Sequence, residues 1–262
     1  MITIHTNTSR NEYDSITKEH LNYSRFKHFL DTPAHLVAYD RAEREQSQAL
    51  LFGDALHTLC LEGTGVFHDS FSVLPENIDR RTKEGKAIYQ EYQATGKKLI
   101  TQEDYDRICK MEVNLRSNDL VKPLMQGGSN EVTLVGEING VKVKARLDRM
   151  TADGDIIDLK SVNDIPTTKN FRSTIFQYKY YVQAAFYSLL LKEATGREPK
   201  FYFIAMEKSD PYSVRVFTLD KEFIERGKKE VIEGLELYKA CVKSNFWPSF
   251  GNVVTEIKLN LD

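Results

Sequence analysis

Residues 131–160 constrain the fold most, because two tight-turn signals divide them into short segments of alternating polarity. The dipeptides at 139–140 (Asn-Gly) and 153–154 (Asp-Gly) accept positive φ at little cost, which is typical of two-residue hairpin turns. Apolar and polar residues alternate strictly between the turns, and the polar set is Lys142, Lys144, Arg146 and Asp148. The stretch therefore predicts three short strands. Their apolar face would pack into the core, and the polar face that carries Lys142, Lys144, Arg146 and Asp148 is here called the working face.

The two turns also predict a strand register that brings acidic side chains together. A two-residue loop at 139–140 places Glu131 opposite Asp148, and a loop centred on residue 153 places Asp148 opposite Asp158. Directly opposite residues on neighbouring strands lie about 5 Å apart. We therefore expect the three carboxylates to lie side by side on the working face.

The same register places two basic residues, Arg146 and Lys160, opposite each other. Like charges at such positions are destabilising unless an opposite charge lies between them. On the third strand, Asp158 and Lys160 project to one side, whereas Ile157 and Leu159 enter the core. Acids beside a pair of bases predict bound cations and a phosphate group, which is a nuclease arrangement.

Asp148 followed by Asp158-Leu159-Lys160 resembles the D…(D/E)xK signature of the PD-(D/E)XK nucleases. In that family the two acids hold divalent metal and the lysine orients or activates the attacking water. The resemblance implies that Asp148, Asp158 and the Leu159 carbonyl bind metal and that Lys160 acts in catalysis. A DxK tripeptide alone is weak evidence, because ordinary composition yields about one in a chain of this length. The alternative is a set of surface charges on a solvated sheet face.

Composition limits the class of protein. The chain has 262 residues, 41% of them hydrophobic, which is sufficient for a single α/β domain with a central mixed β-sheet flanked by helices. Within that domain, 1–262, we expect a mainly helical N-terminal part over 1–125 and the nuclease core over 126–262. With 36 basic and 38 acidic residues the net charge is −2, so any DNA affinity must be local or depend on bound metal.

Neither a membrane protein nor a cysteine-based site is expected. No apolar run is long enough to cross a membrane and residues 1–10 are polar, so we expect a soluble cytoplasmic protein, in the host cytoplasm if a phage encodes it. Cys60, Cys109 and Cys241 are odd in number and far apart, which disfavours disulfides and a four-cysteine cluster.

One histidine, His57, lies on an apolar segment that we expect to be helical and to end at Gly63. A lone histidine in that setting is more often a hydrogen-bonded core residue than a ligand. However, the sequence GDALH at 53–57 is similar to the GxxxH element that precedes the core in RecB-type and RecE-type nucleases. That similarity implies that His57 is a metal ligand, and imidazole binds metal well beside carboxylates.

Residues 75–100 form the most polar stretch. Composition alone favours a solvated loop and an exposed helix there. The string DRRTKEGK at 79–86 is reminiscent of RecE-like phage exonucleases, and its basic side chains are suited to grip a phosphate backbone. The candidate DNA-binding residues, including two from the central hairpin, are Arg80, Arg81, Lys83, Lys86, Lys144 and Arg146.

A long helix is expected from residue 174 to Gly196. Gln183 and Tyr187 are four residues apart and share a face of it, which by itself is ordinary helix packing. In RecB-like nucleases a QxxxY helix follows the DxK strand, and this pair matches that order and spacing. The resemblance implies that Gln183 orients the water or phosphate and that Tyr187 supports it.

These motifs together cover most of the chain and are most similar to the RecE-type, or exonuclease VIII, branch, which is common in phages and prophages. The resemblance implies a magnesium-dependent exonuclease that digests one strand of linear double-stranded DNA from the 5′ end. The product would be a 3′ single strand for a single-strand-annealing protein. The branch also implies a homo-oligomer, with a tetrameric ring as the expected form.

The chemistry of phosphodiester hydrolysis predicts the roles within the site. Two cations about 4 Å apart can neutralise both the attacking and the leaving oxygens. Carboxylate oxygens suit Mg²⁺, or Mn²⁺ in its place, and one imidazole excludes neither. We expect Asp148 to hold both ions, with Asp158, the Leu159 carbonyl and His57 completing the ligands. Lys160, as a neutral amine near the cations, would position and help deprotonate the water, and Glu131 would act through a water or as an outer acid.

Two other functions remain open from the sequence. The same core serves an endonuclease or a junction resolvase, which closed circular DNA as a substrate would distinguish. A catalytically silent DNA-binding or recombination-partner subunit is the alternative from another class. Intact Asp148, Asp158 and Lys160 argue against a silent subunit, because a site without a reaction is free to lose them.

Overall fold

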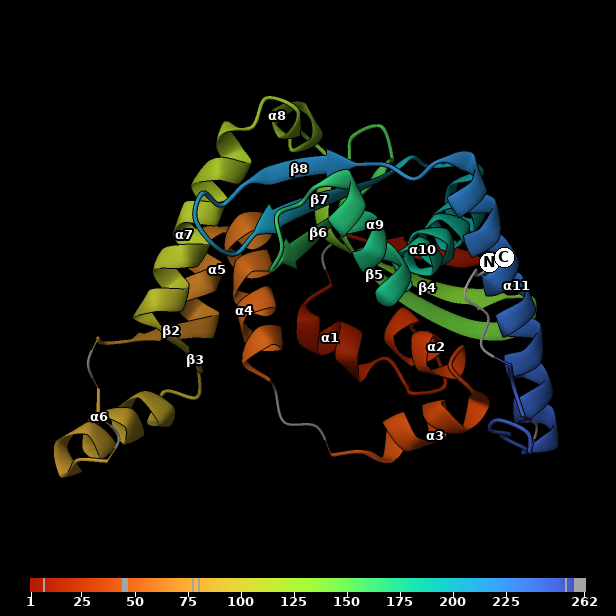
Figure 1. The fold of residues 1–262 in the computed structure, drawn as a ribbon, viewed down its shortest axis with the longest axis horizontal. Helices are drawn as coiled ribbons and strands as arrows, with labels where there is room; N and C mark the ends of the chain where they lie inside the picture. Colours follow the sequence, from red (N-terminus) through yellow and green to blue (C-terminus); the bar gives the residue numbers. More distant parts are fainter. Residues whose placement is uncertain (7, 44–46, 77, 80, 253, 257–262) are drawn as a thin grey trace.

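The computed structural model describes residues 1–262 except 7, 44–46, 77, 80, 253 and 257–262. Its main feature is a mixed sheet with the strand order β1-β4-β5-β6-β7-β8 (Figure 1). Neighbouring strands are antiparallel except β6 and β7, which are parallel. The strands are β1 (Ile2–His5), β4 (Ser129–Ile138), β5 (Val141–Met150), β6 (Ile156–Val162), β7 (Phe201–Glu207) and β8 (Val214–Phe217). A second, parallel sheet joins β2 (Phe71–Leu74) to β3 (Lys98–Thr101).

Helices flank the main sheet, so the expected α/β fold is confirmed. The helices are α1 (Arg10–Ser15), α2 (Tyr23–Phe29), α3 (Pro33–Arg41), α4 (Gln48–His57), α5 (Gly63–Ser70), α6 (Lys83–Ala94), α7 (Gln102–Ser117), α8 (Val121–Leu124), α9 (Thr168–Gln177), α10 (Tyr180–Thr195) and α11 (Lys221–Ser244). A π-helical turn, η1 (Thr58–Glu62), joins α4 to α5. In the part of the chain that the structure describes, no helix is long and apolar enough to cross a membrane.

The register predicted from the two turns is confirmed. Ile138 pairs with Val141 across the first turn, and Arg149 pairs with Ile157 across the second. Continuing these registers places Glu131 opposite Asp148 and Asp148 opposite Asp158. Neither of those two pairs belongs to the regular ladder. The acids therefore lie where the sheet hydrogen bonding is interrupted.

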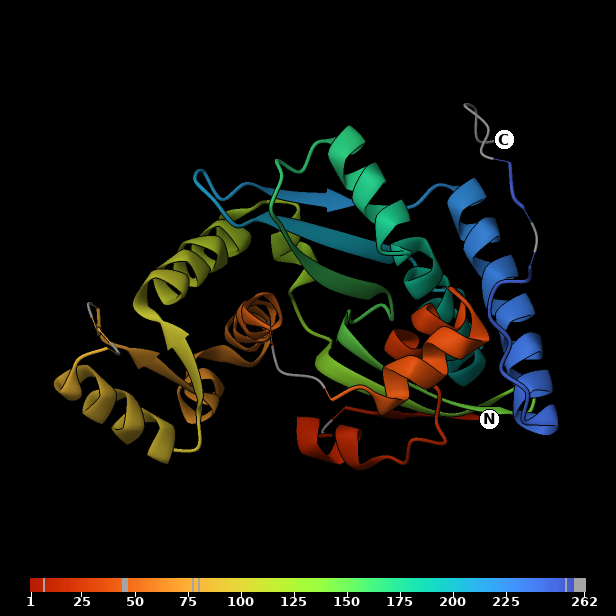
Figure 2. The ribbon, with the colours of Figure 1, turned by 60° about the horizontal axis from the view of Figure 1, so that its bottom comes forward.

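Two apolar cores lie against the sheet and meet at β6. The first, here called the α10 core, includes Ile156 of β6 and packs α2, α10 and α11 on the strands. The second, the α4 core, includes Ile157 and Leu159 and packs α4, α5 and α7. Figures 1 and 2 show these two groups of helices at opposite ends of the sheet. Alternation along β6 therefore sends Ile157 and Leu159 into the α4 core, as expected, while Asp158 and Lys160 point the other way.

The N-terminal part, 1–125, holds the helices α1–α8 and also contributes three short strands. β1 joins the main sheet beside β4, and β2 and β3 make the small sheet. Ile2 and Ile4 lie two residues apart, a spacing that is typical of one face of a strand. Ile2 is buried and Ile4 packs against the α10 core, so this spacing was the sequence signal for β1. Gly63 ends the helical run of α4 and η1, as expected, because its φ of 90° is not helical, and α5 begins at the same residue.

The single helix expected over 174–196 is divided in two. α9 ends at Gln177 and α10 begins at Tyr180. Between them Lys179 has φ 53° and ψ 37°, which is left-handed and cannot continue an α-helix. Sequence periodicity did not reveal the break because the segment contains neither glycine nor proline at that point.

Close packing of α11 on α10 makes Gly227 a test of the fold. A β-carbon added there would lie 2.6 Å from the carbonyl oxygen of Tyr181 and 2.9 Å from the β-carbon of Ala185. We expect Gly227→Ala to lower the free energy of unfolding by about 1–3 kcal/mol, because a backbone atom must move to admit the methyl group. Urea unfolding measures this loss. Glu236→Ala, on an exposed turn of the same helix, is the control and should change stability little.

Candidate active site

Three predicted residues, Asp158, Lys160 and Gln183, form a closed polar triangle between β6 and α10. Lys160 Nζ donates to Gln183 Oε1 at 3.0 Å, and Gln183 Nε2 donates to Asp158 Oδ1 at 2.9 Å. Lys160 Nζ also lies 2.5 Å from Asp158 Oδ2. The amide of Gln183 thus fixes the acid and the base of the DxK motif relative to each other.

Asp148 and His57 meet Leu159 on the other side of β6. Leu159 N–H donates to Asp148 Oδ2 at 2.7 Å, so the aspartate occupies the place of a missing ladder partner. His57 Nδ1 lies 3.5 Å from Asp148 Oδ1, and its Nε2 lies 3.1 Å from the Leu159 carbonyl oxygen. The predicted metal ligands are therefore brought together, although α4 is about one hundred residues from β6 in the chain (|i−j| is 102).

Glu131 lies beside these residues in a strained conformation. Its φ is 52°, which is uncommon for a residue with a β-carbon and is often found at functional sites. Its carboxylate forms an ion pair with Arg146, and both side chains are largely buried. The regular ladder between β5 and β6 does not extend to Arg146 and Lys160, and each of these two bases has its own acid. Arg146 neutralises Glu131, while Lys160 neutralises Asp158.

Burial and ion pairing shift the pKa values of the site residues in opposite directions. Burial raises the pKa of Asp158 to about 6, with the Lys160 ammonium opposing and the Asp148 charge adding to the rise. Burial alone would lower the pKa of His57, but the Asp148 carboxylate raises it to about 9. Burial likewise opposes the charged form of Lys160, yet Asp158, Tyr180 and Asp148 raise its pKa above the ordinary value. Without a cation in the site, Lys160 is thus an ammonium group.

One aromatic ring packs against the lysine. Lys160 Nζ lies 4.4 Å from the centroid of the Tyr180 ring. Tyr187 is buried, and burial raises its pKa well above the ordinary value, while the nearby Gln183 opposes that rise. Tyr187 thus lies beside Gln183, one turn further along α10. Sequence reasoning missed Tyr180, although the aromatic run at 178–181 was a signal for it.

The donor set fits a divalent cation once Lys160 moves aside from Asp158. Among the described residues, no three His, Cys, Asp or Glu side chains form a ready metal cage. However, Asp158 Oδ2 is buried and accepts no hydrogen bond from a described residue, its ion pair with Lys160 apart. Two buried carboxylates and a main-chain carbonyl are the hard oxygen donors that Mg²⁺ and Mn²⁺ prefer. A cation there would offset the cost of burying both acids.

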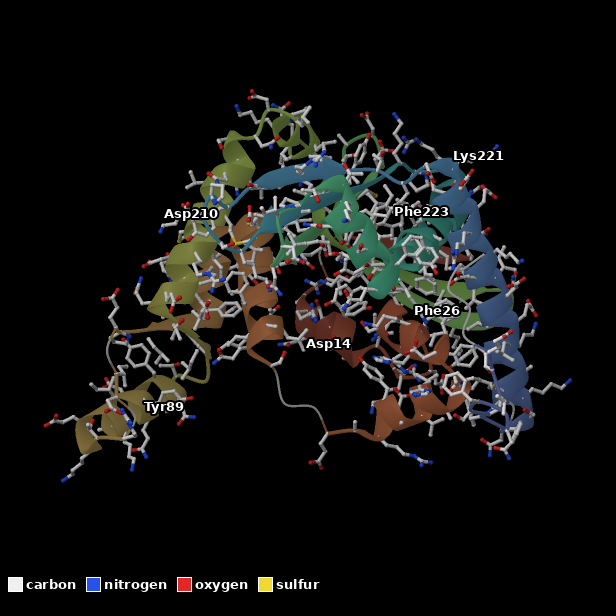
Figure 3. The ribbon with its side chains drawn as sticks, in the orientation of Figure 1. Asp14, Phe26, Tyr89, Asp210, Lys221 and Phe223 are labelled. Carbon is white, nitrogen blue, oxygen red and sulfur yellow. The ribbon has the colours of Figure 1, made fainter. Side chains whose placement is uncertain are left out.

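The six candidate DNA-binding residues fall into separate places. Lys83 and Lys86 are exposed on α6, which stands away from the main sheet (Figures 1 and 2); Tyr89 marks that helix in Figure 3. Arg81 is exposed just before α6 and pairs with Asp79 at 3.0 Å. Arg80 lies outside the described residues.

Two of the six, Lys144 and Arg146, are not available to DNA in this structure. Lys144 is buried and donates to the carbonyl oxygens of Tyr13 and Ile16, both at 2.9 Å. Arg146 is held by Glu131. Both lie on the working face, but α1 and the segment after it cover Lys144, and its ammonium fixes that cover instead of meeting solvent.

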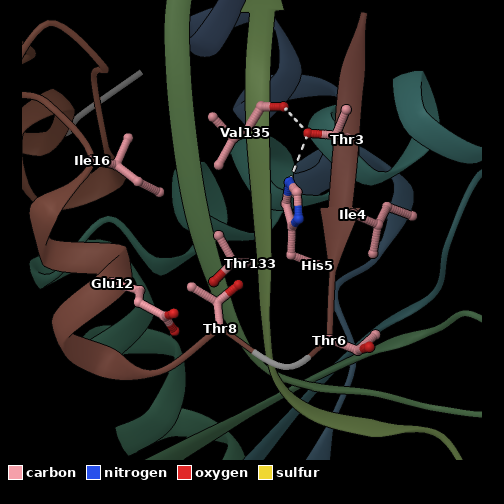
Figure 4. Close-up of a pocket in the computed structure, with 9 residues that line it drawn as sticks. All are labelled: Thr3, Ile4, His5, Thr6, Thr8, Glu12, Ile16, Thr133 and Val135. Atoms are coloured by element: carbon pink, nitrogen blue, oxygen red, sulfur yellow. Dashed lines mark hydrogen bonds between the residues drawn. The ribbon is translucent and has the colours of Figure 1, made fainter.

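The working face continues outward to a pocket of about 660 Å³ between β1, β4 and α1 (Figure 4). Thr3 Oγ1 donates to the Val135 carbonyl at 3.0 Å and lies 3.0 Å from His5 Nε2. Thr133, which also lines the pocket, pairs with Arg146 across the ladder. The Thr133 hydroxyl and Arg146 Nη1 are buried and without a hydrogen-bond partner among the described residues.

Fold and site together define a nuclease core of the PD-(D/E)XK class: a mixed sheet whose interrupted strands present two acids and a lysine, enclosed by two helices. Residues 22–258 match the family described as "PDDEXK-like domain of unknown function (DUF3799)". The chain belongs to that family, and the predicted superfamily is confirmed.

One solved structure agrees on the fold. A crystal structure of a "Putative exonuclease" from Eubacterium rectale superposes with a TM-score of 0.64 at 17% identity, covering 96% of this chain and 96% of that chain. A structure of a protein called SSO0001 has a TM-score of 0.30 at 15% identity, over 75% of this chain and 88% of that chain. No curated protein matches the chain.

Proposed function

We propose that this protein is a divalent-metal-dependent exonuclease that digests one strand of linear double-stranded DNA from the 5′ end. The observation that carries the proposal is the closed triangle of Asp158, Lys160 and Gln183 beside Asp148. Each of these groups has a use in phosphodiester hydrolysis, and the burial of the acids has no evident structural benefit. The order of the motifs along the chain, which resembles the RecE-type branch, supports the 5′ polarity.

The roles of the residues follow from their contacts. Asp148, Asp158 and the Leu159 carbonyl would hold Mg²⁺ or Mn²⁺, with two ions per site. His57 touches both Asp148 and the Leu159 carbonyl, so it either joins the ligands or fixes them. When bound, the cations neutralise phosphate charge and make a water more acidic.

The protein's own residues then orient the reaction. Lys160 would hold the attacking water, because Gln183 fixes its ammonium beside the acids. Tyr187 keeps Gln183 in place. Glu131 would act indirectly, through a water molecule, because its carboxylate already forms an ion pair with Arg146.

Basic residues around the site would receive the DNA backbone. We propose Arg81, Lys83 and Lys86 for the part of the duplex that reaches α6. Arg10 is exposed on α1, where it pairs with Asp14 at 3.3 Å. Burial opposes the charged form of Arg10, but Asp14 first, and then Asp54 and Glu131, raise its pKa. We propose exposed Arg10 for the place that the buried Lys144 and Arg146 were expected to fill.

The wider setting rests on the same resemblance. A 3′ single strand produced in this way is the substrate of a single-strand-annealing protein, which would be the partner in recombination. The enzyme would work as a homo-oligomer, with a tetrameric ring as the expected form, in the cytoplasm of the cell or of the phage host. The name "Putative exonuclease" given to the Eubacterium rectale protein of the same fold agrees with the exonuclease assignment.

The test is degradation of linear duplex DNA labelled at either the 5′ or the 3′ ends, with Mg²⁺ present or chelated. We expect small products from the 5′ label first and no products with chelator, because the acids need a cation before they tolerate a phosphate. Closed circular DNA of the same sequence is the control and should stay intact. Nicked circles would instead make the protein an endonuclease or resolvase, and bound but uncut DNA would make it a silent subunit.

A further inference from the structure

The joint between α9 and α10 is held in an unfavourable conformation beside the active site. Lys179 is left-handed there, with φ 53° and ψ 37°. The buried Tyr23 hydroxyl shares its proton between two carbonyl oxygens of the joint, at 3.1 Å for Tyr178 and 2.6 Å for Lys179. A non-glycine residue in this region costs free energy and persists only where its surroundings fix it. The Tyr23 hydroxyl thus helps to fix the backbone of this joint.

Tyr178, at this joint, is the outermost ring of an aromatic stack. Phe203 of β7 and Tyr180 are stacked, with ring centroids 5.9 Å apart and planes at 26°. Tyr180 and Tyr178 continue the stack at 5.6 Å and 25°. The middle ring, Tyr180, carries Lys160 Nζ 4.4 Å from its centroid. Tyr178 is 45% exposed, so the stack runs from the core, past the catalytic lysine, to solvent.

Two lysines, Lys179 and Lys27, lie near the joint that carries this ring. Lys179 is adjacent to it and pairs with Asp31 at 2.8 Å. Lys27, on α2, makes no hydrogen bond or ion pair with another described residue; burial, Lys160 and Lys179 lower its pKa, while Asp31 opposes the change. One carboxylate therefore serves two ammonium groups, which leaves this surface positive and suited to a phosphate.

We propose that Tyr178 forms a nucleobase-stacking site: the unpaired base at the end of the scissile strand stacks on its ring, while Lys27 and Lys179 bind the adjacent phosphate. Every base has a π-face, so such a site accepts any sequence, as a general exonuclease needs. A base on Tyr178 would lie at the outer end of the stack whose middle ring, Tyr180, contacts Lys160. The inference rests on the proposed function, since it names how the substrate strand enters that same site.

The test is DNA binding in chelated buffer, where no strand is cut, measured by fluorescence anisotropy with short duplexes. One series carries an abasic residue at each terminal position in turn. We expect Tyr178→Ala to bind intact DNA about tenfold more weakly than the wild type does. The duplex that lacks the stacked base should bind equally well to Tyr178→Ala and to the wild type. Tyr178→Phe keeps the ring and should bind like the wild type.

Two controls separate stacking from damage to the joint. Phe176→Ala removes an aromatic residue of α9 that packs on Phe223 instead of Tyr180, at 5.0 Å between centroids, and should bind DNA like the wild type. Tyr23→Phe keeps every ring but releases the joint, and should weaken binding in part.

The proposal is overturned if Tyr178→Ala binds intact DNA as tightly as the wild type. It is also overturned if the loss is the same for intact DNA and for every abasic duplex, because Tyr178 would then act through something other than a base. Hydrolysis is measured separately. A protein that stacks the base but cuts no DNA would disprove the exonuclease and leave the stacking site standing.

Discussion

Lys160→Ala is expected to reduce Mg²⁺-dependent DNA hydrolysis by about a thousandfold while metal still binds. A positioned proton donor or acceptor contributes roughly 10²–10⁴-fold to such reactions, and Lys160 is the amine that Gln183 holds beside Asp158. The substitution also removes a positive charge from the metal-binding acids. Metal affinity should therefore be kept or increased, which separates a catalytic role from a ligand role.

Initial rates on end-labelled duplex measure the loss, and the rise of the melting temperature with Mn²⁺ measures metal binding. Lys229→Ala is the matched control, because Lys229 is 73% exposed on α11, and it should cut DNA at the wild-type rate. Near-normal hydrolysis by Lys160→Ala would remove this lysine from the mechanism. Loss of both hydrolysis and the Mn²⁺ effect would mean that the variant is misassembled.

The sequence was sufficient to predict the part of the fold that local rules determine. Gly140 and Gly154 fix the turns, with φ 80° and φ 76°, and the turns fix the register of the acids. Gln183 was singled out by its resemblance to the QxxxY helix, and the structure places it between Lys160 and Asp158. Local sequence patterns were therefore sufficient to identify residues at the centre of the candidate site.

What escaped prediction depends on contacts distant in sequence. The break at Lys179 is stabilised by Tyr23, more than one hundred fifty positions earlier (|i−j| is 156), and no local propensity marks it. Lys144 alternates correctly onto the polar face, yet α1 folds over it and makes it a structural donor. Alternation assigns a side chain to a face, but it does not say what later covers that face.

Removing the charge of Asp148 should abolish metal binding and activity together. We expect Asp148→Asn to lower hydrolysis by a thousandfold or more, by order of magnitude. An amide oxygen still accepts the Leu159 N–H, so the site should keep its shape. It loses the negative charge that holds a cation, and His57 loses the carboxylate that raises its pKa. Unlike Lys160→Ala, this variant should lose the ligand as well as the reaction.

Melting curves with and without Mn²⁺ test whether Asp148→Asn still binds the cation. A ligand at about ten times its Kd stabilises the native state by roughly 1.4 kcal/mol, which for a chain of this size is a rise of about 3–6 °C in Tm. Wild type and Lys160→Ala should show the rise and Asp148→Asn should not. Asp164→Asn, an exposed charge beyond the end of β6, is the control and should behave as wild type. A full Mn²⁺ effect in Asp148→Asn would place the cation elsewhere, and the sheet acids would then need another explanation for being buried together.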